Sequence, residues 1–432
     1  MSQLDRRQFL GTIAKPAAMA TVAMANPTLL AKAVSKFKTS TYDPKSIARD
    51  ESYWKDIQRG YTKDGIINLN NGGVSPSPTV VQDAMKRHLD FSNTSTAYSM
   101  WQILEPQREP VRRRIARHFG CDPQEIALTR NASEGLQICQ NGFDLAPGDE
   151  VLTTTQDYGR MINTFEQREC RDGIVMKQFK IPIPAENDNE VVQLFEQNIT
   201  PKTKLILMCH MINITGQILP VKKVVHMARK YNIPVIVDGA HTYAHFQFTH
   251  ADLDCDYYAT SLHKWLCAPH GTGMLFVRKN KIADLWPLQA PGKCGTDDIR
   301  KFEEVGTHPA ANYLAIGDAL TFHQGIGDDN KEERLIYLRN RWAKRLLKHD
   351  QIKLHTSLKP GKSCAIATVQ IENFDTSDVA KHLWKNYRIF VVAIKHPEFE
   401  GCRITPHVYT TIEEIDQFAD AMEDILKNGL DV

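Results

Sequence analysis

Short apolar runs alternate with longer amphipathic stretches from about residue 50 onward. The strand-like runs are "EIALTR", "DEVLTTT", "VMKQFKI", "TKLILMCH", "IPVIVDGA" and "GTGMLFVR". Between several of them, apolar residues recur with helical spacing over 105–119, 133–142, 160–171, 188–198 and 220–231. Alternating strands and helices are typical of a mostly parallel sheet covered by helices, so we predict an α/β fold.

The alternation breaks before residue 310, in the turn-rich, charged segment "WPLQAPGKCGTDDIRKFEEVGTHPAA". Two long helices are predicted after it, over 312–325 and 328–349, and the remainder has the pattern of a smaller α+β unit. We therefore predict a large domain over 56–310 and a small C-terminal domain over 311–432. Residues 26–55 are predicted to form an N-terminal arm.

The first 25 residues, "MSQLDRRQFLGTIAKPAAMATVAMA", have the pattern of a targeting segment. Arg6 and Arg7 are followed by Phe9 and Leu10, and a small-residue stretch ends in "AMA". This stretch resembles a twin-arginine export signal, which implies the twin-arginine translocase as a partner and a periplasmic location. The alternative is a basic N-terminus without a targeting role.

Composition narrows the class of protein. With 42% hydrophobic and 24% charged residues, the chain is an ordinary globular protein, and its formal net charge is only +2. A nucleic-acid partner is not expected, because the one basic run, "VRRRIARHF", has the pattern of a solvated helix face. The nine cysteines include no C-x-x-C pair, so neither a disulfide framework nor a zinc ribbon is indicated.

Ligands of open α/β sheets bind beyond the carboxyl ends of the strands, so polar residues at those ends are candidates for a site. Ala132 and Ser133 in "NASEG" open a predicted helix. The N-terminus of this helix could bind a phosphate, or its polar residues could simply cap the helix. Tyr158 in "QDYGR" could stack on a flat ligand or pack in the core. Asn213 in "NITG" could bind a hydroxyl or form an Asx turn.

Asp238 directly follows the apolar run "IPVIV" and therefore needs a cation or several donors to offset the loss of water. A protonated ring nitrogen would be such a partner. The alternative is a metal site, since Asp238, His241 and His245 have spacings that metal ligands adopt. That alternative implies a metal-dependent hydrolase, or a binding protein without catalytic activity.

Lys264 lies in "TSLHKW", where a β-rich stretch meets a turn, close to Ser261 and His263. Burial there would disfavour the ammonium form and lower the pKa of Lys264 from its usual value near 10.4. A lysine of this kind is nucleophilic near neutral pH and suits Schiff-base chemistry, although a lysine at a turn is more often on the surface. Taken together, the strand-end residues describe a site for pyridoxal 5′-phosphate.

The motifs "TRNASEG", "VDGAH" and "SLHK" carry a resemblance to a known family. The sequence resembles the class V aminotransferase branch of the fold type I pyridoxal-phosphate enzymes, close to the isopenicillin N epimerase and cysteine desulfurase-like group. The similarity runs from about residue 68 to residue 416. It implies a homodimer in which each chain has a large cofactor-binding domain and a smaller C-terminal domain.

The resemblance also implies a role for each candidate residue. Lys264 would form the imine with the cofactor, and Asp238 would face its ring nitrogen. Arg403 would bind the carboxylate of the substrate, and Thr307, in "EEVGTHPAAN", would reach the phosphate bound by the partner subunit. The remaining roles are phosphate binding by Ala132, Ser133, Ser261 and His263, contact with the phenolic oxygen by Asn213 and His241, and ring stacking by Tyr158.

One departure bears on the reaction. Cysteine desulfurases carry a nucleophilic cysteine on a loop shortly before the arginine, whereas residues 388–401 contain none, and Cys402 has the pattern of a packed residue. We therefore expect an enzyme of the aminotransferase or epimerase type that acts on an amino acid or a peptide-like amine. A lyase, decarboxylating or oxidising enzyme that tailors a peptide siderophore is a further alternative, which rests on analogy with exported relatives.

Overall fold

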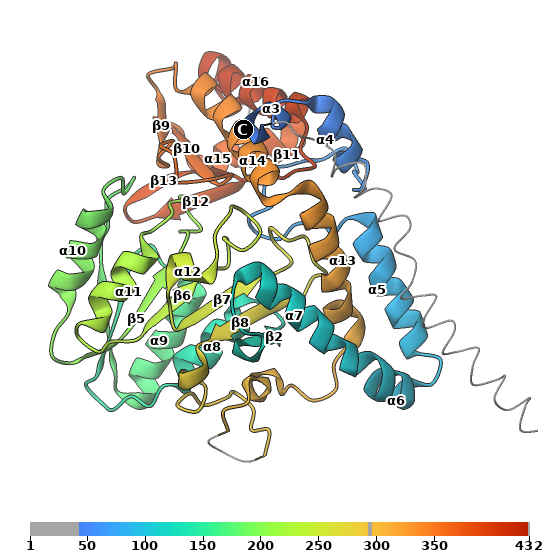
Figure 1. Ribbon diagram of the computed structural model, residues 1–432. Helices are drawn as coiled ribbons and strands as arrows, with labels where there is room; N and C mark the ends of the chain where they lie inside the picture. Colours follow the sequence, from blue (N-terminus) through green and yellow to red (C-terminus); the bar gives the residue numbers. More distant parts are fainter. Residues whose placement is uncertain (1–42, 293–295, 431–432) are drawn as a thin grey trace, which may run out of the picture.

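The structure is a computed structural model that describes residues 43–292 and 296–430. The predicted export signal lies outside the described residues. A seven-stranded sheet forms the centre of the larger part, with the strand order β2-β8-β7-β6-β5-β3-β4 (Figure 1). Its strands are β2 (Ile126–Thr129), β3 (Glu150–Thr154), β4 (Val175–Phe179), β5 (Thr203–Cys209), β6 (Val235–Asp238), β7 (Tyr257–Ser261) and β8 (Gly273–Val277). Strand β8 runs antiparallel to both neighbours and the others are parallel, which confirms the predicted mostly parallel α/β sheet.

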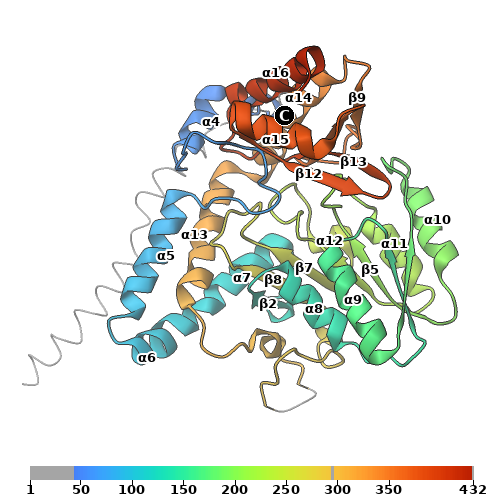
Figure 2. The same ribbon diagram turned by 180° about the vertical axis from the view of Figure 1, so that it is seen from behind.

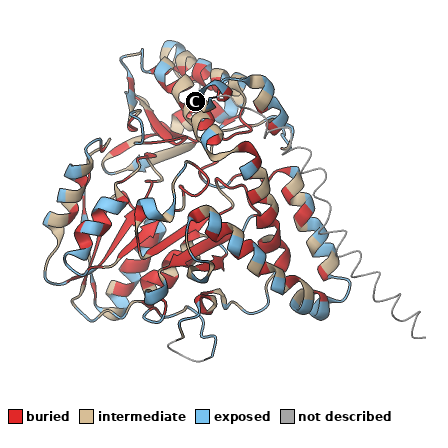
Figure 3. Cartoon of the chain, in the orientation of Figure 1, coloured by how far each residue is buried: buried red, intermediate tan, exposed pale blue. Residues whose placement is uncertain are grey.

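Helices cover both faces of this sheet, as Figures 1 and 2 show from opposite sides. Alternate residues of β5 enter two different cores: Ile206 and Met208 pack with one group of helices, Leu205 and Leu207 with the other. Because both faces are buried, the central strands are continuous apolar runs, which is the pattern seen in the sequence. The burial map shows the same sheet as a buried layer between half-exposed helices (Figure 3).

Five helices of the larger part, α7 to α11, lie close to their predicted positions, and the larger part also contains α5, α6 and α12, which were not predicted. The helices of this part are α5 (Thr79–Ser92), α6 (Thr96–Tyr98), α7 (Arg108–Phe119), α8 (Ala132–Gly142), α9 (Gly159–Asp172), α10 (Asp188–Asn198), α11 (Val221–Arg229) and α12 (His250–Leu253). Short non-α helical turns complete it: η1 (Ser99–Leu104), η2 (Glu105–Gln107), η3 (Pro123–Glu125), η4 (Lys279–Lys281) and η5 (Ile299–Glu303). The helix predicted from residue 105 begins as α-helix only at Arg108, because the residues before it form η1 and η2.

The smaller part has an antiparallel sheet with the order β12-β13-β10-β9. The strands are β9 (Ile352–Leu354), β10 (Ala367–Ile371), β12 (Val392–His396) and β13 (Phe399–Ile404), and the helices are α14 (Asp328–Leu346), α15 (Thr376–Tyr387) and α16 (Ile412–Asn428). The N-terminal helices α3 (Pro44–Ile47) and α4 (Glu51–Gln58) precede β1 (Ile67–Asn68), which pairs in parallel with β11 (Ile389–Phe390). The N-terminal segment therefore packs on the small part before the chain forms the large part.

Helix α13 (Ala310–Ile326) joins the two parts. Its buried residues Ala310 to Leu320 belong to the same core as α7 and the central sheet, and it lies along α5 in both views. The predicted boundary at residue 310 placed this helix in the small domain, whereas its packing groups it with the large one. No helix among residues 43–292 and 296–430 is long and apolar enough to cross a membrane.

The loop after β5 joins the large part to the small one. The backbone oxygens of Ile214 and Thr215 accept hydrogen bonds from Thr368 Oγ1 at 2.6 Å and Thr356 Oγ1 at 2.5 Å. Gly216 has a φ of +72°, and a Cβ atom there would lie 2.1 Å from the carbonyl oxygen of Ile366. Both the backbone conformation and the close approach therefore require glycine at this position.

We expect Gly216→Ala to destabilise the protein far more than Gly361→Ala. Both glycines have a φ of +72°, so both substitutions cost about 1–2 kcal/mol of backbone strain. Only Gly216 also meets backbone atoms, which adds about 1–3 kcal/mol of overpacking, because nothing lies within 4 Å of the Cβ position at Gly361. Denaturant unfolding of both variants measures the difference, and equal losses of stability would contradict the described contact.

Candidate active site

The carboxyl ends of β5, β6 and β7 bring the candidate residues together. Asp238 is the last residue of β6 and pairs in register with Cys209, the last residue of β5. Ser261 is the last residue of β7, and the turn that follows carries Lys264. The residues predicted from strand ends thus come from neighbouring strands of one sheet edge, as the topological rule for α/β sheets requires.

Packing on its neighbour Trp265 fixes the turn that bears Lys264. The Trp265 ring is stacked on His245, with 3.5 Å between ring centroids and an angle of 6°, and His407 lies near-parallel to it at 5.3 Å. Lys331 Nζ donates to the carbonyl oxygen of Trp265. Because Lys331 and His407 belong to the small part, the position of Lys264 depends on both parts of the chain.

The buried Asp238 and the half-buried Lys264 each influence the pKa of the other. Burial raises the pKa of Asp238 to about 6, while its Oδ1 accepts one hydrogen bond, from the Ala240 backbone N–H at 2.9 Å. Burial lowers the pKa of Lys264 to about 8, although the negative charge of Asp238 opposes that shift. Lys264 Nζ lies 3.1 Å from His241 Nε2, and burial keeps the pKa of His241 well below its usual value, so the neutral ring accepts this hydrogen bond.

A second carboxylate, which the sequence did not single out, lies beside the pair. Asp157 directly precedes Tyr158 and accepts four hydrogen bonds, from Thr153 Oγ1, Thr154 N, Thr154 Oγ1 and Cys209 N, at 2.7–2.8 Å. These donors satisfy the carboxylate within the protein, and its negative charge contributes to the raised pKa of Asp238. The position of Asp157 just after the apolar strand that ends in "TTT" could have identified it as a candidate, as it did Tyr158.

The first turn of α8 lies against the end of β7. The backbone N–H of Ala132 donates to Ser261 Oγ at 3.0 Å, and Ser133 follows it, partly exposed, in the first turn. His263 Nδ1 donates to the carbonyl oxygen of Thr272 at 2.9 Å, and burial lowers the pKa of His263 to about 4. The structure therefore brings three of the four predicted phosphate residues, Ala132, Ser133 and Ser261, to one helix N-terminus, where backbone donors favour an anion. His263 lies in the turn after β7, and its contact with a phosphate stays a prediction.

Arg403 on β13 extends from the small part towards the same edge. It donates through Nη1 to the Asn213 carbonyl oxygen at 3.0 Å and through Nη2 to Asn70 Oδ1 at 2.9 Å. Its Nε is buried and has no hydrogen-bond partner in the described part of the chain, and burial lowers its pKa to about 10. Tyr158, at the N-cap of α9, is close enough for its charge interaction to oppose that shift. Asn70 was not predicted, because asparagine is common in turns such as "NLNNGG" without any binding role.

The alternative metal site is not supported. His245 Nδ1 donates to the carbonyl oxygen of His241 at 2.7 Å, and its Nε2 accepts from the Ala365 N–H at 3.0 Å. Both ring nitrogens are therefore engaged within the protein and unable to bind a metal. Across the described ranges, the one group of metal-ligand type is elsewhere, at His118, His323 and Asp328.

Two other expectations concern Thr307 and Cys402. Thr307 is exposed and lies in the loop before α13, and its role across a dimer stays a prediction. Cys402 is 2% exposed and its Sγ lies 3.7 Å from the Thr376 carbonyl oxygen, and burial raises its pKa to about 12. Cys402 is thus a packed residue, as predicted, and not an exposed thiolate.

The sheet, the strand-end lysine and aspartate and the covering small domain define a fold type I pyridoxal-phosphate enzyme. The family model "Aminotransferase class-V" matches residues 67–418, and the chain belongs to this family. It is 28% identical to isopenicillin N epimerase of Amycolatopsis lactamdurans, over 87% of this chain and 99% of that protein. A probable cysteine desulfurase of Synechocystis sp. is 24% identical, over 83% and 90%. A solved mutant of C-DES with glycine covalently linked to its PLP cofactor has a TM-score of 0.75 and 23% identity, covering 84% of this chain and 100% of its own.

Family membership confirms pyridoxal 5′-phosphate as the cofactor, and the residues present fit it. The buried Asp238 carboxyl has a raised pKa and accepts its hydrogen bond from Ala240 through Oδ1, which leaves Oδ2 to suit a protonated ring nitrogen. His241 Nδ1 is buried without a partner in the described chain, and Lys264 stands beside the same ring. The start of α8 supplies donors for the phosphate.

The pKa of Lys264 leads to a pH prediction for cofactor-free protein. We expect acylation of Lys264 by acetic anhydride, followed by mass spectrometry, to increase with a midpoint near pH 8. Asp238→Asn removes a negative charge that favours the ammonium form, so its midpoint should fall below that of the wild type. Arg403→Gln removes a positive charge, so its midpoint should rise. A wild-type midpoint above pH 10, or shifts in the same direction, would show that this electrostatic account is wrong.

Proposed function

We propose that this protein is an exported pyridoxal-phosphate enzyme that inverts the α-carbon of an amino acid or peptide-like substrate. The observation that carries the proposal is the half-buried Lys264, whose amine lies 3.1 Å from Nε2 of the neutral His241 ring and interacts with the charge of Asp238, and whose pKa burial lowers to about 8. Such an amine is half unprotonated at a pH equal to its pKa, and in that form it can accept and return a proton at Cα. Amino transfer, in which the proton goes elsewhere, is the second candidate and is favoured by the family as a whole.

One relative and the burial of two cysteines favour the epimerase type over the desulfurase type. The relative with 28% identity is named isopenicillin N epimerase, and the match spans nearly its whole length. Desulfurase chemistry needs a thiolate nucleophile near the substrate, whereas Cys402 is packed in the small part. Cys209, at the end of β5, is also buried, and its pKa is well above the usual range because of burial and the nearby Asp157.

Each residue has a defined task in this proposal. Bound pyridoxal 5′-phosphate supplies the electron sink for the charge left when the Cα proton departs. Asp238 keeps a proton on the ring nitrogen, and Arg403 binds the substrate carboxylate with its planar guanidinium. Lys264 moves the Cα proton, and His241 holds Lys264 in place through the 3.1 Å contact between Nζ and Nε2.

A deuterium-exchange screen distinguishes the candidate reactions. We expect the protein in D₂O to exchange the α-proton of its substrates with inversion of configuration and little keto-acid release. Lys264→Ala should reduce the exchange rate roughly a thousandfold, since it removes the general base. NMR measures exchange, chiral chromatography measures inversion, and a coupled assay measures the keto acid. Stoichiometric keto acid would favour amino transfer, and sulfide release from cysteine without exchange would contradict the proposal.

We also propose export by the twin-arginine pathway and assembly as a homodimer in which Thr307 reaches the neighbouring site. The paired Arg6 and Arg7 with the following Phe9 support export. Replacing both arginines with lysine should leave folded, cofactor-loaded protein in the cytoplasm, as measured by cell fractionation and the visible absorbance of the cytoplasmic fraction. A variant that reaches the periplasm at the wild-type level would refute this assignment.

A further inference from the structure

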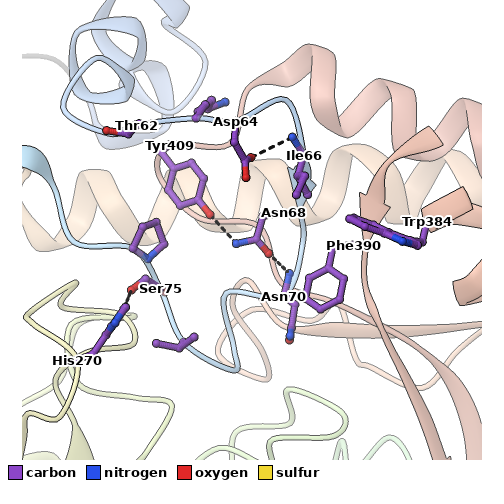
Figure 4. A pocket seen from close by; sticks show the side chains of 13 residues that line it. Thr62, Asp64, Ile66, Asn68, Asn70, Ser75, His270, Trp384, Phe390 and Tyr409 are labelled. Atoms are coloured by element: carbon purple, nitrogen blue, oxygen red, sulfur yellow. Dashed lines mark hydrogen bonds between the residues drawn. The ribbon is translucent and has the colours of Figure 1, made fainter.

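A cavity of about 620 Å³ opens between the N-terminal segment 62–76 and the small part of the chain. Figure 4 shows its lining, with Asn68 and Tyr409 on one side and Trp384 and Phe390 on the other. The remaining lining residues are Thr62, Lys63, Asp64, Ile66, Asn70, Val74, Ser75, Pro76 and His270. This volume is typical of pockets that enclose a drug-sized ligand, and it exceeds what a short aliphatic side chain needs.

The cavity shares two walls with the active site. Asn70 lines it, and the Oδ1 atom of Asn70 accepts the hydrogen bond from Arg403 Nη2 at 2.9 Å. Ser75 also lines it, and the Ser75 N–H donates to the carbonyl oxygen of His263, the residue before Lys264, at 3.2 Å. A substrate whose carboxylate is bound by Arg403 therefore has this cavity beside it.

Several polar groups of the lining are already paired within the protein. Asn68 Nδ2 donates to Tyr409 Oη at 3.0 Å, and Asn68 Oδ1 accepts from the Asn70 N–H at 3.0 Å. Lys63 forms an ion pair with Glu414 at 2.7 Å. A polar ligand could bind these groups only by breaking their present hydrogen bonds and ion pair, which costs free energy. The lining of the cavity therefore favours an apolar ligand.

The apolar part of the lining is exposed to an unusual degree for large side chains. Trp384 is 39% exposed, Phe390 45% and Val74 45%. The two aromatic rings meet edge to face, with centroids 6.0 Å apart and an angle of 74°. Several large apolar side chains that face one cavity mark a binding surface, because each gains free energy when a ligand removes it from water.

We infer that this cavity binds the distal part of the substrate, and that the substrate is an amino acid with a long side-chain or peptide extension that ends in an apolar or aromatic group. This inference rests on the proposed function, because it needs Arg403 to bind the α-carboxylate and Lys264 to reach the α-carbon. Trp384 and Phe390 are then specificity residues for the extension.

Two probes with the same α-carbon test the inference. Nε-benzyloxycarbonyl-lysine has a long aromatic extension, and norleucine has a comparable aliphatic stem without it. With the loaded wild-type enzyme, isothermal titration calorimetry should show at least tenfold tighter binding of the benzyloxycarbonyl probe. Trp384→Ala and Phe390→Ala should each remove most of that preference and leave norleucine binding unchanged. Tyr231→Ala, which alters an aromatic residue 46% exposed on the large part, is the matched control and should keep the preference.

Equal affinity of the two probes for the wild type, or no binding of either, would overturn the inference. Loss of preference together with a changed molecular mass in size-exclusion chromatography with light scattering would assign the two rings to a contact between subunits and would also overturn it. The visible band of the cofactor separates the two proposals. If the benzyloxycarbonyl probe binds more tightly but the visible band does not change, the cavity is supported and the proposed function is contradicted. If both probes bind equally and the visible band changes, the proposed function is supported and the inference about the cavity is overturned.

Discussion

The structure depends on placing two ionisable side chains, the buried Asp238 and the half-buried Lys264, close together at the edge of one sheet. Burial disfavours the charged form of each, and the opposite charge of the neighbour partly offsets that penalty for both. The shifted pKa values of the pair require that other parts of the protein cover the strand ends. Contact with water would otherwise restore the ordinary pKa values. Helices on both faces of the sheet and the small part beyond its edge provide that cover.

The small part also sets the geometry of the site. It supplies Arg403, supports Trp265 through His407 and Lys331, and binds the loop that carries Asn213. The backbone of Gly216 lies so close to Ile366 that this loop has little freedom to move independently of the small part. One interface between the two parts consequently couples three features of the site. These are the binding of the substrate carboxylate, the orientation of Lys264 and the wall of the adjacent cavity.

Much of this organisation could be predicted from the sequence, because apolar runs reveal buried strands and charged residues at their ends require partners. Asp238, Lys264 and the start of α8 followed from that reasoning. The role of His245 did not, since its spacing suits a metal ligand equally well, and only tertiary contacts with Trp265 and the Ala365 N–H distinguish the two. The packing of α13 was also missed, because a helix buried on most sides has no clear polar face to indicate which core it joins. Strand direction is not encoded in hydrophobicity, so the antiparallel β8 could not be anticipated.

The central claim is that Lys264 is the residue that binds the cofactor covalently. Borohydride reduction of the yellow protein, followed by proteolysis and peptide mass mapping, tests it most directly. The account predicts loss of the visible band and a single reduced phosphopyridoxyl adduct on the peptide that contains Lys264, with none in a Lys264→Ala variant. An adduct on another lysine, or a visible band that borohydride leaves intact, would contradict it.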